Sequence, residues 1–409
     1  MKKYVPFVIV IITMLFITGV TMYSFVDDTK VSKAEQRKLA KMPGLSVDNW
    51  KSAEFQKQFE GFIGDHVWKR NEFISLGKKM EGYMRLPGKS LILKDVAEQD
   101  NDNNNQAEVI LLDDRIVQLY KHNDENLVYF FDSCKKFYSM VPDGVDKYLV
   151  IPPGRIEYEE DSVRESSNSG EYDYKLVYQN MDKSVKTVPV YDVVKKGVKK
   201  NGINEIFFRT DHHWTQLGAY YAAREFLKAA GKTAINIEDY ERKQGYDFHG
   251  YLTSQYNKEE MISPDQFYYY MPKNGSECTE TVYLKNTETG KIEMKQEKVV
   301  DPYRGGYYSF LERSQFAYDV IDGQKDDGSV LLVVTDSYGY AFTTWLVSQY
   351  EKIIVVDPRC YRGVDAPFMD LFKTYNVTDV VMCLQQTEMS INLFNKQMMN
   401  NLLGIKELK

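Results

Sequence analysis

Short apolar runs alternate with amphipathic stretches along the chain from about residue 106 onward. Runs rich in Val and Ile are typical of buried strands, whereas apolar residues spaced three and four apart are typical of helices. The pattern predicts strands at 148–151, 187–191, 329–334, 353–356 and 380–384, and helices at 125–141, 215–230, 340–350 and 368–375. Strands that alternate with helices in this way indicate an α/β fold with a parallel sheet and crossover helices.

The alternation stops between about residues 240 and 310. This part holds an aromatic run at 267–270 and, at 286–290, the sequence Asn-Thr-Glu-Thr-Gly, which is suited to the tip of a hairpin. We therefore predict a β-rich insertion, outside the α/β core, within a larger domain that spans residues 106–409.

The first 26 residues differ from the rest of the chain. Lys2 and Lys3 precede an apolar run at 5–26 that contains no charged residue. A run of roughly 20 apolar residues is long enough to cross a bilayer. The pattern predicts an uncleaved transmembrane anchor, with the N-terminus in the cytoplasm and the remainder outside. A cleaved signal peptide is the alternative and would make the domain secreted, but Val20 and Met22 stand where small residues are preferred.

Residues 27–105 form a segment between the anchor and the main domain. Phe55, Phe59 and Phe62 recur at helical spacing, so a helical N-terminal extension is expected. Residues 100–105 read Asp-Asn-Asp-Asn-Asn-Asn, which cannot bury an apolar face and indicates a polar linker.

Composition narrows the class of function. The chain has 52 Lys and Arg against 59 Asp and Glu, a net charge of −7, which argues against a nucleic-acid binder with a basic face. The 31 tyrosines are expected mainly in the core and at interfaces, although exposed ones would suit stacking on sugar rings. The cysteines are far apart and form no zinc-binding pattern: Cys134, Cys278, Cys360 and Cys383.

A candidate nucleophile lies at the end of a predicted buried strand. The sequence Leu-Leu-Val-Val-Thr-Asp-Ser-Tyr-Gly at 331–339 places Ser337 in a turn between that strand and a helix. Such a serine can be exposed at the carboxyl edge of the sheet, where free backbone N–H groups stabilise an oxyanion. The same sequence is also typical of an ordinary helix N-cap, so both interpretations stay open at this point.

A candidate base and its partner lie in the sequence Thr-Asp-His-His-Trp at 210–214. A serine hydroxyl needs a base to remove its proton, and a neutral imidazole does this well near pH 7. The imidazole needs a carboxylate to fix its tautomer, so Asp211 and His213 have suitable chemistry. In one alternative, Asp211 or Thr210 caps the next helix and a histidine fills a polar crevice. In another, the group binds a metal, which would need further ligands that do not stand out beside a strand.

The string Asp-His-His-Trp-Thr at 211–215 resembles the motif that names the DHHW protein family of Gram-positive bacteria. The wider pattern is similar to that of the alginate-acetylation enzymes, which are SGNH-hydrolase-like O-acetyltransferases. Other segments agree in order: Glu-Gln-Arg-Lys-Leu at 35–39, Asp65 with Arg70, Ile-Pro-Pro-Gly-Arg at 151–155, Thr-Asp-Ser at 335–337 and Val-Asp-Pro-Arg at 356–359. The resemblance covers nearly the whole chain from residue 30.

This resemblance implies an SGNH-hydrolase-like, three-layer α/β sandwich with a flavodoxin-like parallel sheet and its site at the carboxyl ends of the strands. It also implies a catalytic set of Ser337, His213 and Asp211. The order is permuted, because the Asp-x-His pair precedes the serine. Asp-x-His spacing favours His213 over His212 as the base.

Some positions depart from the pattern. Ser337 follows Thr-Asp rather than Gly-Asp, and the usual Gly and Gly-x-Asn-Asp blocks are not recognisable. The Ser337 backbone N–H is therefore our first choice of oxyanion donor. Further candidates for an oxyanion donor or for substrate binding are Arg359, Tyr361 and Gln385 at strand ends, together with His212.

By resemblance, we expect serine-dependent transfer of an acyl group, preferably acetyl, to a cell-surface or secreted polysaccharide through an acyl-enzyme. No metal or other cofactor is expected. A multi-spanning membrane acyltransferase would supply the acyl group, and the catalytic domain would stand outside the cell membrane. The alternatives are a carbohydrate esterase, if water resolves the acyl-enzyme, and a non-catalytic glycan-binding subunit of an envelope-polymer machine.

Overall fold

The structure is a computed structural model of the chain, which describes residues 108–274, 278–285, 292–311, 316–361 and 368–405, with short stretches before residue 95. The chain divides into two compact units, Met1–Leu86 and Pro87–Lys409. In the first unit, helix α3 (Glu54–Asp65) carries Phe55, Phe59 and Phe62 and so confirms the predicted helical spacing, with the rings of Phe55 and Phe59 stacked at 5.6 Å. Two short strands, β1 (Val31–Ser32) and β2 (Arg37–Lys38), pair antiparallel.

No helix among the residues that the structure describes is long and apolar enough to span a membrane. Most of the predicted anchor, and the predicted linker at 100–105, lie outside the described residues. The anchor therefore stays a prediction.

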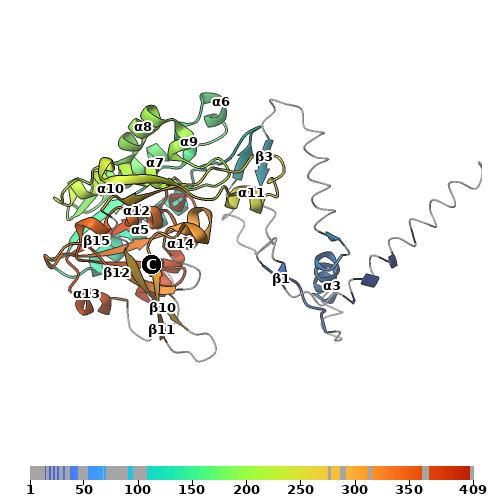
Figure 1. Ribbon diagram of the computed structural model, residues 1–409. Coiled ribbons are helices and arrows are strands. Elements are labelled where there is room, and N and C mark those ends of the chain that lie inside the picture. The colour runs from blue at the N-terminus through green and yellow to red at the C-terminus, as the bar shows by residue number, and fades with distance from the viewer. Residues whose placement is uncertain are drawn as a thin grey trace, which may run out of the picture. The chain divides into compact units, whose positions relative to one another are not determined.

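The second unit is built on an eight-stranded sheet in the order β11-β10-β12-β14-β13-β15-β6-β7 (Figure 1). Neighbouring strands from β14 to β7 are parallel, whereas β12, β10 and β11 continue the sheet antiparallel. The strands are β6 (Asp146–Val150), β7 (Val185–Val188), β10 (Thr279–Lys285), β11 (Ile292–Lys298), β12 (Phe316–Asp322), β13 (Val330–Thr335), β14 (Lys352–Val356) and β15 (Asp379–Cys383). The predicted parallel sheet is thus confirmed for the strands from β14 to β7, and the complete sheet is mixed but mainly parallel.

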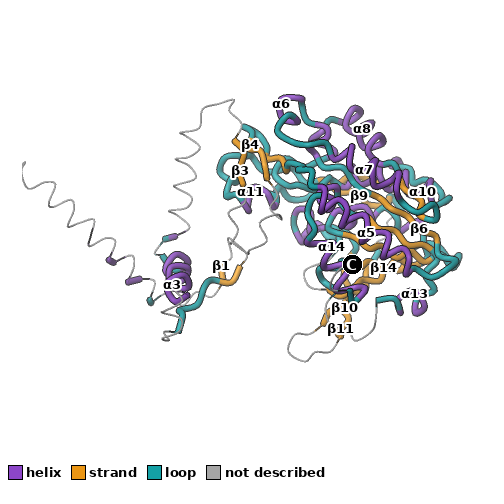
Figure 2. Tube along the Cα trace, turned by 180° about the vertical axis from the view of Figure 1, so that it is seen from behind, coloured by secondary structure: helices purple, strands orange, loops and turns teal. Residues whose placement is uncertain are grey.

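Both faces of the central strands are covered. Every residue of β13 and β15 is buried, as expected for strands with a layer on each face. On one face α10 packs against α8 and α12, and on the other α5 packs against α14 (Figure 2). The described helices of this unit are α5 (Asp124–Met140), α6 (Asp161–Arg164), α7 (Gly170–Asn180), α8 (Val190–Asn201), α9 (Ile203–Ile206), α10 (Gln216–Ala229), α11 (Tyr251–Gln255), α12 (Tyr338–Thr344), α13 (Asp370–Thr374) and α14 (Leu393–Leu403).

Most predicted elements of the core are present, with two corrections. The predicted strand at 187–191 ends at Val188, and α8 begins directly after Pro189. Proline lacks the N–H that a ladder needs and its φ suits the start of a helix, so it divides the two elements. The predicted helix at 340–350 ends at Thr344 and is followed by a separate 3-10 turn at Val347–Gln349.

The predicted insertion is rich in strands but does not stand apart from the core. Strand β8 (Tyr240–Gln244) pairs antiparallel with β9 (Tyr268–Pro272). The predicted hairpin is formed by β10 and β11, whose connection lies outside the described residues. Because β10 also pairs with β12, the hairpin extends the main sheet at its edge. A separate three-stranded sheet contains β3 (Leu91–Lys94), β4 (Glu108–Leu111) and β5 (Ile116–Gln118).

Candidate active site

Ser337 lies at the carboxyl end of β13, directly before α12. The preceding Asp336 holds this turn, because its two carboxylate oxygens accept hydrogen bonds from the backbone N–H of Tyr338 (2.8 Å) and of Gln385 (2.7 Å), which follows β15. The helix can start so tightly because residue 339 is glycine: a Cβ there would lie 2.0 Å from the Thr335 hydroxyl oxygen. Ser337 is half-buried, so a substrate can reach it.

The Ser337 hydroxyl does not cap α12. It instead donates to Nε2 of His213, at 2.6 Å. On the other side of the ring, Nδ1 donates to Oδ1 of Asp211, also at 2.6 Å. The structure therefore brings these three side chains, which are 126 positions apart at their extremes, into one chain of hydrogen bonds. The N-cap of α10 is Thr215, so the interpretation of Asp211 as that cap is wrong.

The Asp211 carboxylate is 5% exposed and is surrounded by donors. Its Oδ1 also accepts from the His213 backbone N–H (3.0 Å), and its Oδ2 accepts from the Tyr251 backbone N–H (2.8 Å). Burial by itself raises the pKa of this carboxyl, but the charge and hydrogen bond of His213, the nearby His212 and the Tyr251 N–H together lower it far below its ordinary value. The carboxylate is thus ionised and can stabilise an imidazolium.

His212 does not take the position of the base. Its ring lies 3.9 Å from that of His213, centroid to centroid, and its Nδ1 is buried without a hydrogen bond. Burial lowers the pKa of His212 to about 3, and the adjacent charges of His213 and Arg359 act in the same direction against the opposing effect of Asp211. His212 is therefore a neutral neighbour of the Ser337–His213 pair.

The same three residues form the only group of possible metal ligands found among the described residues. One ligand atom from each of Asp211, His212 and His213 lies within 4.8 Å of the others. However, both ring nitrogens of His213 already take part in the hydrogen bonds to Asp211 and Ser337. A cation bound by all three residues would have to break one of those bonds.

Two features that sequence reasoning missed come from the insertion. Tyr307, in the 3-10 turn Gly306–Ser309, stacks on the His213 ring with centroids 3.8 Å apart and planes 6° apart. Its hydroxyl donates to the Tyr338 carbonyl, as does Nε1 of Trp214, which is fully buried and serves as a packing wall. Gly250 packs against the acid, since a Cβ there would lie 2.4 Å from the Asp211 Cβ. In the sequence, the only sign of these contacts was the large number of tyrosines in the insertion.

The remaining candidates from the sequence are Arg359, Gln385 and Tyr361. Arg359 donates to Asp357 at 2.6 Å and lies near enough to His212 to affect its pKa. Gln385 reaches the site through its backbone N–H on Asp336. Tyr361 is buried, and its ring packs edge-on against that of Phe368, with centroids 5.7 Å apart.

Burial raises the pKa of the Asp336 carboxyl to about 6, although the two backbone donors and Arg359 oppose the change. The backbone N–H of Ser337 itself donates to no acceptor among the described residues, and so it is available to a ligand.

Fold and site together define the class: an α/β protein with a mixed, mainly parallel sheet and with Ser, His and Asp in hydrogen-bond contact at the strand ends. The profile described as "DHHW protein" matches residues 143–356, slightly more than half of the chain. The chain therefore belongs to the DHHW family. A comparison of the sequence with curated proteins gave no match.

Two solved structures show the same fold, and a third match has a lower score. A DHHW family protein from Eubacterium siraeum DSM 15702 is 24% identical, with a TM-score of 0.61 over 72% of this chain and 95% of that one. Bacillus cereus PatB1, solved with a sulfonyl adduct, is 16% identical, with a TM-score of 0.56 over 70% of this chain and 97% of that one. The O-acetyltransferase domain of Pseudomonas putida AlgJ is 14% identical, with a TM-score of 0.38 over 71% and 98%.

Proposed function

We propose that the protein is an extracytoplasmic enzyme that transfers an acyl group, preferably acetyl, to a hydroxyl of a polysaccharide through an acyl-enzyme on Ser337. The observation that carries this proposal is the unbroken chain of hydrogen bonds from Asp211 through His213 to Ser337. The motif resemblance to the alginate-acetylation enzymes is the reason for naming an acyl group as the transferred group and a polysaccharide as the acceptor. A membrane anchor, and a membrane acyltransferase as the source of the acyl group, belong to the same proposal.

In the first half of the reaction, the Ser337 oxygen attacks the acyl carbonyl carbon while its proton passes to Nε2 of His213. The ionised Asp211 stabilises the imidazolium, and the Ser337 backbone N–H faces the developing oxyanion. The tetrahedral intermediate collapses as the bond to the donor's leaving oxygen breaks, and that oxygen takes the proton from His213. The products are the free donor alcohol and acyl-Ser337.

In the second half, a sugar hydroxyl attacks the acyl-enzyme and gives its proton to His213. Collapse returns the proton to the Ser337 oxygen and releases the sugar ester. Water in place of the sugar would release the free acid, which is the esterase reaction. Exclusion of water from the acyl-enzyme therefore decides between the two outcomes.

The test is turnover of p-nitrophenyl acetate by the full chain in detergent, with and without added oligosaccharides. Ser337→Ala and His213→Ala should each abolish turnover, whereas Ser254→Ala, at an exposed serine of α11, should not change it. Acetylated sugar would support transfer, and acetate alone would indicate an esterase. Turnover that persists in Ser337→Ala, or no turnover at all, would overturn the proposal and favour a glycan-binding subunit.

A sulfonyl fluoride gives an independent readout, since PatB1 was solved with a sulfonyl adduct. Mass spectrometry should find one adduct on the wild-type chain, on Ser337, and none on Ser337→Ala. Labelling that is equal in the two proteins would contradict the assignment of the nucleophile.

A further inference from the structure

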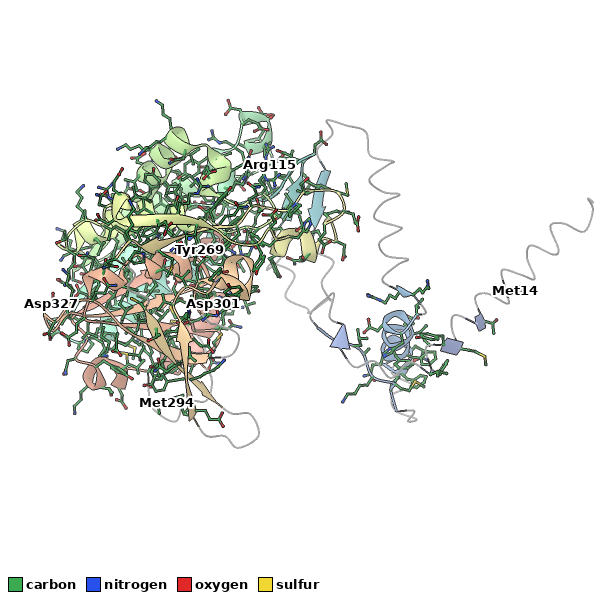
Figure 3. The ribbon with its side chains drawn as sticks, in the orientation of Figure 1. Met14, Arg115, Tyr269, Met294, Asp301 and Asp327 are labelled. Carbon is green, nitrogen blue, oxygen red and sulfur yellow. The ribbon has the colours of Figure 1, made fainter. Side chains whose placement is uncertain are left out.

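A cavity of about 430 Å³ lies apart from Ser337, between the loop that carries Asp211 and the paired strands β8 and β9. These strands can be located in Figure 3 by Tyr269, on β9. The volume is within the range of ordinary small-ligand sites. The side chains that matter for its chemistry are Glu205, Arg209, Arg242, Asp265, Gln266 and Tyr268.

Each arginine that lines this cavity is already paired with a carboxylate, and Asp247 adds a third carboxylate to the lining. Arg242 bonds Glu205 at 2.8 Å, and its guanidinium lies over the Tyr268 ring, 3.8 Å from the centroid. Arg209 lies 3.4 Å from Asp265 and donates to the backbone carbonyls of residues 114, 263 and 264. An anionic ligand would have to compete with a carboxylate for each arginine, so phosphate and acidic sugars fit poorly.

A neutral ligand rich in hydroxyls fits better. The Arg242 and Glu205 side chains are each 40% exposed, so hydroxyls can approach the charged pair without separating it. The Tyr268 hydroxyl donates to Gln266 at 3.1 Å, which adds an oriented amide to the lining. Phe208 and Leu217 provide apolar wall, as the C–H faces of a sugar ring require. The mixture of aligned polar groups and apolar wall is typical of sites that orient a small ligand.

The cavity is also tied to the acid of the active site. Asp265 in its wall accepts from the backbone N–H (2.8 Å) and the hydroxyl (2.6 Å) of Thr210, the residue before Asp211. Asp247 lines the cavity, and four residues further on the Tyr251 N–H donates to Asp211. Four extended residues span at most about 13 Å, so the Asp247 wall and the segment that holds Asp211 are close neighbours.

We propose that this cavity binds a neutral sugar unit of the polysaccharide acceptor while another unit of the same polymer is presented to Ser337. The inference rests on the proposed acyl transfer to a polysaccharide. It adds that the acceptor is uncharged and that the protein holds the polymer at a second position, away from Ser337. None of Ser337, His213 and Asp211 lines the cavity, so its residues position the polymer and take no part in proton transfer.

The test uses the full chain in detergent with chitotetraose and maltotetraose as neutral probes, and isothermal titration as the readout. Arg242→Ala and Tyr268→Ala should each weaken binding of a probe at least tenfold and reduce acetylation of that probe. Turnover of p-nitrophenyl acetate should stay within twofold of wild type, since that ester is too small to need the cavity. Matched controls are Arg164→Ala, from an exposed ion pair with Asp161, and Tyr172→Ala, an exposed tyrosine of α7, and neither should change binding.

Some outcomes would overturn the inference. Binding by the two cavity variants that equals binding by the controls would place the sugar elsewhere. The inference would also be overturned if neither neutral probe bound the wild-type protein. Selective binding of an acidic trigalacturonate or of a peptide would overturn it as well. The Ser337→Ala protein should bind the probes normally, so loss of catalysis and loss of the cavity site are measured separately. Circular dichroism of each variant verifies that the fold is retained.

Discussion

Replacement of Asp211 by asparagine should lower kcat/KM for p-nitrophenyl acetate by about 10³-fold and leave the fold intact. Three donors point at the carboxylate: the His213 backbone N–H, the His213 ring Nδ1–H and the Tyr251 backbone N–H. Asparagine has one acceptor oxygen, so one orientation turns its NH₂ toward the Tyr251 N–H. In the other orientation NH₂ donates to Nδ1, which forces the ring proton onto Nε2, where the ring cannot accept the proton of Ser337.

The magnitude follows from what the substitution removes. A hydrogen bond to a charged group contributes about 1.5–3 kcal/mol, and a buried polar group left unpaired costs about 1–3 kcal/mol more. A total of roughly 4 kcal/mol corresponds to about 10³-fold in rate, since each 1.36 kcal/mol is tenfold. The assay is steady-state turnover by Asp211→Asn beside Asp161→Asn, a matched control at an exposed position of α6 that should keep the wild-type rate.

The pH dependence sharpens this test. The pKa of Asp211 is held far below its ordinary value. The carboxylate is therefore charged at neutral pH and becomes protonated only when the pH falls through the lowered pKa. Titration of Asp211 should therefore contribute nothing to the pH dependence of the wild-type rate between pH 5 and 9. A loss of less than tenfold at any pH from 7 to 9 would refute the assigned role of this carboxylate.

Three further substitutions test the surroundings of the site. Tyr307→Leu should reduce kcat about tenfold because stacking contributes about 0.5–1.5 kcal/mol, while Tyr307→Phe should have a smaller effect; equal effects in a rate assay would contradict a role for the ring. The pKa of His212 is about 3 in the folded protein and about 6.5 in the unfolded chain. Its contribution to the free energy of unfolding is therefore fully present above the unfolded pKa and is lost as the pH falls toward the folded pKa. Urea unfolding at pH 7.5 and pH 5 should therefore show about 2 kcal/mol more acid destabilisation in wild type than in His212→Gln, and identical losses would argue against the lowered pKa. Gly250→Ala should lower the free energy of unfolding by about 1–3 kcal/mol and impair turnover, because the new Cβ meets Asp211; Gly64→Ala, with open space around it, should do neither.

The central strands could be predicted because they are covered on both faces. β13, β14 and β15 read as nearly continuous apolar runs, which is what burial between two layers requires. The segment at 187–191 was harder, because its Thr and Val residues favour a strand on both sides of Pro189, where the backbone changes direction. Helices α7 and α14 were missed, since their apolar stripes are weak and tertiary packing completes them.

The candidate site could be predicted only as far as chemistry is local in sequence. The spacing of Asp211 and His213 and the strand-end position of Ser337 were visible, and the structure joins them by hydrogen bonds. The contacts of Tyr307 and Gly250 were not visible, because each meets its partner only after the insertion folds back on the core. Stacking and close approach carry no periodicity, so no pattern along the chain indicates them.

The strand order explains why the insertion became part of the site. Read from β13, the five parallel strands follow the flavodoxin-like order 2-1-3-4-5, so β6 and β7 are its last strands although they come first in the chain. This permutation requires a connection from α10 back to β13, and that connection is the stretch containing β8 to β12. It donates to Asp211 through the Tyr251 N–H and covers His213 with Tyr307. A short connection would still close the chain, but it would expose the acid and the base to water and weaken the electrostatic coupling on which a Ser–His–Asp set depends.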